Sequence, residues 1–376
     1  MEEWKEYKLG EITNMKNGKK RPQNNGAFPV YGGNGIMDYS DSHNAENVII
    51  VGRVGAYCGC VYKCDSKCWV SDNAISVFAK DIVDTQFLYY LMTTLDFHHH
   101  HIGGAQPLMT QDIIGDFTVS IPPLSVQNQI VHILKSLDDK IEVNRRINDN
   151  LDQQAQALFK SWFVDFEPFR NQPFVESELG MIPEGWQVGT LADITRQRNE
   201  KVGKQEDVKV LSPVTTGKLM LSEEYFTKQV FSESIAKYKV VEIGDFAYNP
   251  ARVNIGSIGR NGYDFRGCVS PVYVVFSCKE DYNYFFDLFR KTKKFQTEVK
   301  ARAIGGVRQS LNYTDFCFIQ TVIAPSDVMK NFNPYYEKIQ TTKNNLEEEN
   351  SRLSSLRDTL LPRLMSGEIK VEDVTK

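Results

Sequence analysis

Four of the seven cysteines lie close together, and they are the residues of this chain best suited to metal chemistry. Cys58, Cys60, Cys64 and Cys68 could supply thiolates to zinc, but the spacing C-x-C-x3-C-x3-C lacks the paired C-x2-C knuckles of structural zinc sites. The segment AYCGCVYK alternates as a strand does, which would place the first two thiols on one face. Free cysteines are more often small buried hydrophobic residues, so we expect no metal here.

Catalytic motifs are equally sparse. The chain contains neither G-x-G-x-x-G nor a P-loop. The segment Asn249-Pro250-Ala251-Arg252 begins like the N-P-P-F/Y motif of adenine methyltransferases, but the second proline and the aromatic residue are missing. Four consecutive histidines at 98–101 could suggest a metal site, yet adjacent residues do not converge on one ion in regular structure, which favours a polar loop. We therefore expect no catalytic residue and no cofactor.

Length and composition predict a chain of two domains with connecting helices. A chain of 376 residues is too long for a single hydrophobic core. Its composition, 41% hydrophobic and 24% charged residues, is typical of a globular protein. Neither a signal-peptide region nor a run of about 20 apolar residues is present, so we expect a cytoplasmic protein. The net charge of −4 excludes nucleic-acid binding by overall charge, so any basic surface must be local or come from partner subunits.

An internal repeat organises these elements. Trp4, Leu9, Ile12 and Thr13 recur with a constant offset of 182 as Trp186, Leu191, Ile194 and Thr195. Three further segments recur in the same order: VSDNAISVF as VSPVYVVF, FLYYLM as YFFDLF, and GGAQPLMTQD as GGVRQSLNYTD. Four matched landmarks imply two copies of one unit.

Short alternating runs, separated by Gly, Pro and Asn, predict that each copy is a strand-rich α+β globule. Proline disfavours helix in the residue before it, so IPPL ends the first globule and a long helix follows. We predict a first globular domain at 1–124, a long helix at 125–166, a linker at 167–185, a second globular domain at 186–325, a second long helix at 326–366 and a tail at 367–376.

Both long helices carry the narrow apolar stripe of a coiled coil, with steps of four and three residues. We predict that the two stripes pair antiparallel, with Ile130 opposite Leu364 and Asn144 opposite Asn350. A buried polar pair of this kind lowers stability but determines the register. The predicted seam comprises Leu134, Leu137, Ile141, Asn144, Leu151 and Leu158 in the first helix, and Tyr336, Ile339, Leu346, Asn350, Leu353 and Leu360 in the second.

Several motifs give the chain a resemblance to a known family. They are WKEYKLGEIT and GWQVGTLADIT at the starts of the repeats, IPPLSVQNQIV and ALFKSWFVDFEPF around the first helix, and LRDTLLPRLMSGEI near the C-terminus. Over nearly its whole length the chain resembles the specificity (S) subunit of type I restriction-modification systems. The resemblance implies two target-recognition domains that each read half of a bipartite site in double-stranded DNA, and an antiparallel coil that sets the spacer. It also implies a non-catalytic chain that docks methyltransferase subunits, two of them, with or without restriction subunits.

If the chain reads DNA, two-pronged hydrogen bonding from Arg, Asn or Gln recognises bases, while Lys and Arg hold phosphates. Glycine-rich loops bring these groups close to the duplex. The candidates in the first domain are Lys19, Lys20, Arg21, Asn34, Arg53, His100, His101 and Gln106. The candidates in the second domain are Arg196, Arg198, Lys218, Asn249, Arg252, Asn254, Arg302, Arg308 and Gln309.

Other interpretations of the basic residues and of the duplication stay open. The cluster KTKK at 291–294 is expected to be a solvated helix face, with phosphate contact as the alternative. A non-catalytic protein-interaction scaffold with duplicated domains would suit the acidic pI of about 6.0. An enzyme with duplicated domains is a third possible class of protein, beside the DNA-recognition subunit and the scaffold.

Overall fold

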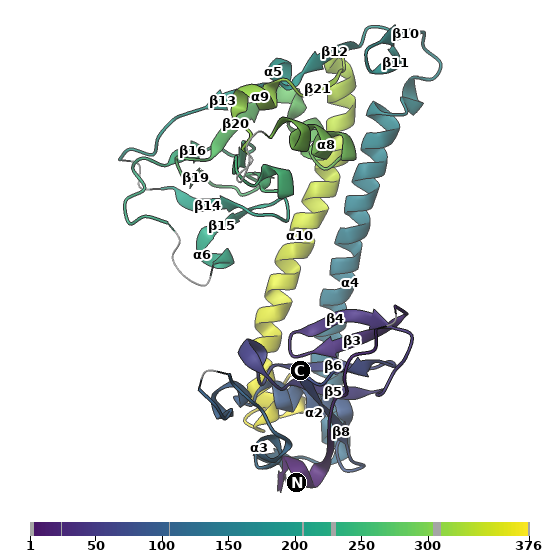
Figure 1. Ribbon diagram of the computed structural model, residues 1–376, viewed down its shortest axis with the longest axis vertical. Helices are drawn as coiled ribbons and strands as arrows, with labels where there is room; N and C mark the ends of the chain where they lie inside the picture. The colour runs from purple at the N-terminus through teal and green to yellow at the C-terminus, as the bar shows by residue number, and fades with distance from the viewer. Residues whose placement is uncertain are drawn as a thin grey trace. The chain divides into compact units, whose positions relative to one another are not determined.

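A computed structural model of the protein describes residues 4–23, 25–104, 106–204, 207–226, 231–303 and 310–374. The chain divides into two compact units, Met1–Arg146 with Leu346–Lys376, and Ile147–Asn345. Both units are rich in short strands and each contains one half of both long helices (Figure 1). The predicted α+β class, with two strand-rich units and two long helices, is confirmed.

Unit 1 is built around the central strand β5 (Val48–Gly52), in which every residue is buried. Ile49 and Val51 face one apolar core, while Val48 and Ile50 face a second core on the other side of the sheet. The main sheet has the order β2-β8-β5-β6, and a smaller sheet has the order β4-β3-β7. The other strands are β1 (Lys5–Lys8), β2 (Thr13–Asn17), β3 (Phe28–Gly32), β4 (Gly35–Ser40), β6 (Val61–Cys64), β7 (Trp69–Val70), β8 (Ala74–Ala79) and β9 (Thr118–Ile121). The short helices are α1 (Leu9–Ile12), η1 (Gly55–Tyr57), α2 (Thr85–Thr93), η2 (Phe97–His100), α3 (Gln111–Gly115) and α11 (Val371–Val374).

Unit 2 repeats this plan around β17 (Phe246–Tyr248), whose three residues are fully buried. Its main sheet has the order β13-β20-β17-β18, and the second sheet has the order β15-β14-β19-β16. The remaining strands are β10 (Phe174–Ser177), β11 (Gly180–Pro183), β12 (Gln187–Thr190), β13 (Thr195–Arg198), β14 (Lys209–Pro213), β15 (Leu219–Leu221), β16 (Lys239–Val241), β18 (Ile258–Arg260), β19 (Gly267–Val269), β20 (Val274–Cys278) and β21 (Gln320–Ile323). The helices are η3 (Glu167–Phe169), α5 (Leu191–Ile194), α6 (Ser222–Tyr225), η4 (Val253–Ile255), η5 (Glu280–Tyr282), α7 (Asn283–Phe289), α8 (Lys293–Arg302) and α9 (Tyr313–Cys317).

Matching hydrogen bonds support the internal repeat. The Thr13 hydroxyl donates to the Leu9 carbonyl at 2.6 Å, and the Thr195 hydroxyl donates to the Leu191 carbonyl at the same distance. In the second sheet of each unit, β3 pairs parallel with β7 and β14 pairs parallel with β19. Each unit thus has a four-stranded main sheet and a second sheet with one parallel pair, and this second sheet has three strands in unit 1 and four in unit 2. The matched sequence landmarks predicted the duplication but not these sheets.

The long helices are α4 (Leu124–Phe163) and α10 (Ser326–Met365), and each has 40 residues. In unit 1 the Asn144 amide donates to Oδ1 of Asn350 at 3.0 Å, so the predicted antiparallel register is confirmed there. Of the predicted seam, Leu134, Ile141, Asn144 and Tyr336 are buried. The half-buried seam residues are Leu137, Leu151, Leu158, Ile339, Leu346, Asn350, Leu353 and Leu360.

Lys343 and Arg357 lie at the same steps of three and four residues as the predicted seam, and each forms an ion pair that sequence periodicity did not predict. In unit 1, Arg357 contacts Asp138 at 2.9 Å between Nη1 and Oδ1. In unit 2, the Lys343 ammonium contacts Asp152 at 2.7 Å. Each pair joins α4 to α10, so charged seam residues are accommodated by carboxylates beside the seam.

The strand predicted for AYCGCVYK is wrong in its first half. Gly55 and Gly59 have positive φ angles of 75° and 85°, which turn the chain before β6 begins at Val61. Cys58 is buried beside the Arg53 carbonyl. Within the described ranges, His, Cys, Asp and Glu side chains form no group that could hold a metal ion, and no helix is long and apolar enough to cross a membrane.

Candidate nucleic-acid interface

Two predicted contact residues lie at equivalent hairpin turns. Asn34 is exposed at the tip of the two-residue turn between β3 and β4, where Gly32 pairs with Gly35. Lys218 is exposed in the turn between β14 and β15 of unit 2. This second turn is closed by hydrogen bonds from Val214 N to the Lys218 carbonyl at 3.0 Å and from Gly217 N to the Val214 carbonyl at 3.1 Å.

The loops that follow the central strands carry the next group of predicted residues. Arg53 follows β5, and its Nη1 donates to the Asp72 carbonyl at 3.4 Å. In unit 2 the corresponding loop after β17 contains Asn249, Arg252 and Asn254. Arg252 is exposed, whereas the Asn249 side chain accepts from Ala251 N at 3.0 Å and shapes the loop.

In both units the hairpin turn lies against the loop after the central strand. A Cβ on Gly33 would lie 3.6 Å from the Val54 carbonyl oxygen. A Cβ on Gly256 would lie only 2.6 Å from the Thr215 carbonyl oxygen, and Gly256 has a φ of 96°. Both properties require glycine at position 256. The structure therefore brings Asn34 near Arg53, and Lys218 near the loop that carries Asn254.

The basic segment of unit 1 is anchored beside the same region. Lys19 N donates to the Val70 carbonyl at 3.0 Å, and the Lys19 and Lys20 side chains are exposed. Arg21 forms an ion pair with Asp38 at 3.3 Å, so part of its charge is offset. Both side chains are about half exposed, so solvent screens this ion pair and it contributes little to stability.

The histidine run forms a tight turn rather than a free loop. The ring of His98 contacts the Cys58 carbonyl at 3.1 Å, and His99 contacts Asp96 at 2.7 Å. His100 is exposed and packs edge-on against Phe117, with ring centroids 5.0 Å apart. His101 is half-buried, and its Nδ1 has no hydrogen-bond partner in the described part of the chain. Gln106 is exposed.

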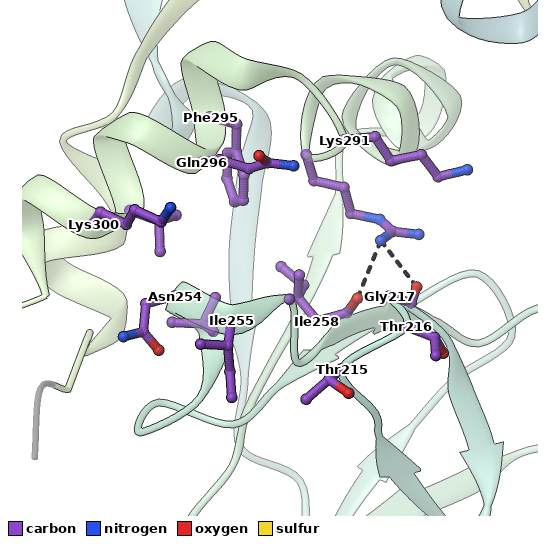
Figure 2. Close-up of a pocket in the computed structure, with 14 residues that line it drawn as sticks. Thr215, Thr216, Gly217, Asn254, Ile255, Ile258, Lys291, Phe295, Gln296 and Lys300 are labelled. Carbon is purple, nitrogen blue, oxygen red and sulfur yellow. Dashed lines mark hydrogen bonds between the residues drawn. The ribbon is translucent and has the colours of Figure 1, made fainter. Parts of the chain in front are cut away.

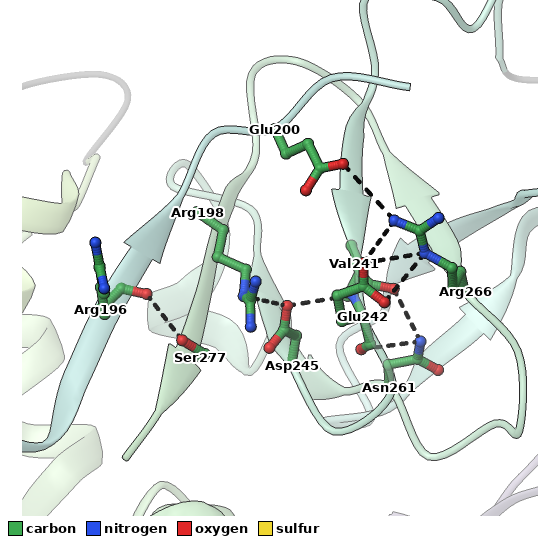
Figure 3. A network of polar contacts seen from close by, with 9 residues as sticks. All are labelled: Arg196, Arg198, Glu200, Val241, Glu242, Asp245, Asn261, Arg266 and Ser277. Atoms are coloured by element: carbon green, nitrogen blue, oxygen red, sulfur yellow. Dashed lines mark hydrogen bonds and ion pairs between the residues drawn. The ribbon is translucent and has the colours of Figure 1, made fainter. Parts of the chain in front are cut away.

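Two predicted arginines of unit 2 lie on strand β13, beside a polar network (Figure 3). Arg196 is exposed and Arg198 is half exposed. Arg198 Nε lies 2.8 Å from Oδ2 of the buried Asp245. Burial raises the pKa of Asp245 to about 6, and the Arg198 charge opposes this rise. Arg198 is therefore oriented by a carboxyl that sequence reasoning did not identify.

The segment that contains the predicted contact residues Arg302, Arg308 and Gln309 is described only in part. Arg302, at the end of α8, forms an ion pair with Glu298 at 2.8 Å, one helical turn away. Arg308 and Gln309 lie outside the described residues, and their contacts with DNA stay predictions.

A cleft of about 340 Å³ lies beside the Lys218 turn. Figure 2 shows α8 on one side, with Gln296 and Lys300, and the turn at Thr215 and Thr216 with η4 on the other. Gln296 was missed by sequence reasoning because no motif distinguishes it from other helix residues. The expected solvated face for KTKK is wrong at its first position. Lys291 is two-thirds buried on its side chain and lies 3.6 Å from Asp152.

The fold is duplicated, and each unit presents polar side chains at a hairpin turn and in the loop after its central strand. Residues 1–153 match the family model described as the type I restriction modification DNA specificity domain. A specificity subunit of the type I restriction enzyme MjaIX from Methanocaldococcus jannaschii is 26% identical over 320 residues, covering 80% of this chain and 72% of the relative. The HindI specificity subunit from Haemophilus influenzae is 25% identical, covering 71% of this chain and 72% of the relative.

The fold is also similar to a solved structure, the S subunit of a type I restriction-modification system from M. genitalium. The TM-score is 0.63 with 15% sequence identity, and 96% of each chain is covered. The resemblance to type I specificity subunits that the sequence motifs predicted is thus confirmed.

Proposed function

We propose that this chain is the sequence-specific DNA-recognition subunit of a type I restriction-modification complex. Each unit reads one half of a bipartite site, and the chain itself contributes no catalytic group. The observation that supports this most directly is the pairing of equivalent loops: both units present a hairpin turn beside the loop after the central strand, with different side chains at the two places. A common scaffold with different loop side chains suits two different half-sites.

The bases are read by exposed side chains of these loops. Arg53 and Arg252 can form two hydrogen bonds with guanine, and Asn34 can do so with adenine. Lys19, Lys20 and Lys218 suit phosphate contacts because a lysine ammonium acts as a point charge. Arg21, Arg198 and Arg302 reach DNA only by leaving a carboxylate partner, which lowers the gain from each contact.

The coil of α4 and α10 sets the spacer and docks two methyltransferase subunits, with or without restriction subunits. A straight helix of 40 residues is about 60 Å long at 1.5 Å per residue, and a turn of duplex DNA is about 34 Å. The coil is thus on the scale of a site that spans more than one helical turn. The net charge of −4 gives the isolated chain little long-range attraction to phosphate, so partner subunits complete the DNA-binding surface.

The test is to assemble the full chain with its cognate methyltransferase subunits and to map methylated adenines in DNA exposed to the complex. We expect a bipartite site with a constant spacer, and a gel shift that sharpens when the methyltransferase is added. A complex that methylates or binds DNA without sequence preference would contradict the proposal. A complex that binds no DNA but captures proteins through the loops would favour the scaffold interpretation.

A further inference from the structure

The cleft between α8, η4 and the turn at Thr215 has an unusual set of charges. None of the 14 described residues that line it carries a carboxylate. Lys300 is exposed at its rim and has no ion-pair partner within the described ranges. The nearby Glu298 is engaged by Arg302 on the same helix. The cleft therefore offers a net positive charge to whatever enters it.

Neutral hydrogen-bonding groups complete the lining. Thr215 and Thr216 carry exposed hydroxyls on one wall, and Gln296 carries an exposed amide on the other (Figure 2). Lys291 contributes less because its ammonium is directed to Asp152, and burial lowers its pKa. One available ammonium with hydroxyl and amide groups is a lining suited to a phosphodiester, whose oxygens accept hydrogen bonds and carry one negative charge.

A buried network holds the floor of the cleft. Arg290 is 8% exposed, and its Nη1 donates to the carbonyl oxygens of Gly217 at 3.0 Å and Ile258 at 3.1 Å (Figure 2). Its Nε and Nη2 atoms donate to Oδ1 of Asp287, at 2.9 and 2.5 Å. The Tyr336 hydroxyl on α10 donates to Oδ2 of Asp287 at 2.7 Å. The turn that carries Thr215 is thus tied through two side chains to the long helix.

The described part of unit 1 does not contain this network. At the positions that correspond to Asp287 and Arg290, the matched segments place Tyr90 and Thr93. Tyr90 donates instead to Asp138 on α4 at 2.6 Å, and the Thr93 hydroxyl donates to the Tyr90 carbonyl of its own helix at 2.7 Å. The arginine that holds the turn is therefore a feature of unit 2 and not of the shared scaffold.

We propose that this cleft binds a backbone phosphate of DNA, with Lys300 as the charged ligand and Thr215, Thr216 and Gln296 as neutral ligands. Arg290 is a positioning residue that keeps the threonine wall at the correct distance from α8. The site rests on the proposed function, because a DNA backbone is its occupant. It contributes affinity and register on the duplex rather than base preference.

The test is the salt dependence of DNA binding by the full chain assembled with its methyltransferase subunits. Two probes are used: a duplex that carries the mapped site and a duplex with the site scrambled. K300Q should weaken binding to both probes and reduce the slope of log K against log salt by about 1, since one phosphate contact is lost. K293Q is the matched control, because Lys293 is exposed on the same helix and does not line the cleft.

Equal slopes for K300Q and K293Q would overturn the site, and so would a loss of binding restricted to the duplex that carries the mapped site. If the wild-type complex itself shows no preference between the two probes, the proposed function has failed, whatever the variants do. R290K tests the positioning role, because lysine keeps the charge beside Asp287 but cannot reach both carbonyls. If Arg290 acts through the cleft, the single variant R290K should lower the salt slope, and combining it with K300Q should lower the slope little further. Additive losses would reduce Arg290 to a structural role.

Discussion

The Asn144 amide on α4 donates to Oδ1 of Asn350 on α10 at 3.0 Å and to Oε2 of Glu349 at 2.7 Å. Asn144 is fully buried, so this amide occupies a place in the seam that an aliphatic side chain could fill. A buried polar pair of this kind selects one register because any shift leaves the amide without a partner.

A double-mutant cycle tests this pair. N144L alone should lower the free energy of unfolding by about 1 kcal/mol, because Asn350 loses its partner inside the seam. N144L with N350L should recover or exceed wild-type stability, since two apolar residues then pack together. Urea unfolding of the full chain measures wild type, N144L, N350L and the double variant, which together complete the cycle. Strictly additive losses would mean that the two amides do not act as a pair.

The acid stability of unit 2 should depend on Asp287. Burial by itself would raise its pKa, but the charges of Arg290 and Lys291 and the hydrogen bond from Tyr336 hold the pKa of this carboxyl well below its ordinary value. A lowered pKa contributes stability above the unfolded value of about 4, and that stability is lost as pH falls towards the folded value. D287N leaves Arg290 buried without a counter-charge and should cost about 3–5 kcal/mol at neutral pH.

Stability measured against pH distinguishes these contributions. Wild type should lose stability as pH falls below about 4, whereas D287N should be less stable at pH 7 and show a smaller loss in acid. D264N serves as a control because Asp264 is exposed. A D287N variant with the acid profile of wild type would show that other carboxyls govern the transition.

Through Asp245, the stability of unit 2 should depend on pH in the opposite direction. Its pKa is raised by burial to about 6, so the folded chain keeps a proton that the unfolded chain loses near pH 4. Stability should therefore fall as pH rises from about 4 to 6, and D245N should remove this slope.

The substitution also releases Arg198, which lies 2.8 Å from Asp245, and should strengthen DNA binding if Arg198 contacts the duplex. R198Q in the D245N background should cancel that gain; unchanged DNA binding by D245N would exclude Arg198 from the interface.

The long helices and their register could be predicted because both depend on local periodicity and on one matched asparagine pair. The duplication could be predicted because Trp4, Leu9, Ile12 and Thr13 recur at a constant offset of 182. The structure adds that the Thr13 and Thr195 hydroxyls make equivalent hydrogen bonds. The charged seam partners could not, since Asp138 and Asp152 lie beside the apolar stripe and no periodicity selects them.

Less of the candidate site than of the fold could be predicted from the sequence. Glycine and amide residues predicted contact residues in two segments that the structure shows to be hairpin turns, where Asn34 and Lys218 are exposed. The sequence did not indicate that Arg198 is held by Asp245, which is 47 residues distant and buried by tertiary packing. The pairing of Arg302 with Glu298 could have been predicted from the sequence, because the two residues are four apart on one helix.

The length of the coil gives the last prediction. Inserting one heptad into both α4 and α10, after residue 146 and after residue 345, keeps the seam pattern in both helices because the repeat of a coiled coil is seven residues. Each helix lengthens by about 10 Å, close to the rise of three base pairs. We expect methylation mapping to give unchanged half-sites with a spacer longer by about three base pairs, provided that the rotation of the added turns is accommodated. An insertion of four residues in one helix alone is the control, since it shifts the seam and should abolish specific binding. Altered half-sites with an unchanged spacer would show that the coil does not set the spacing.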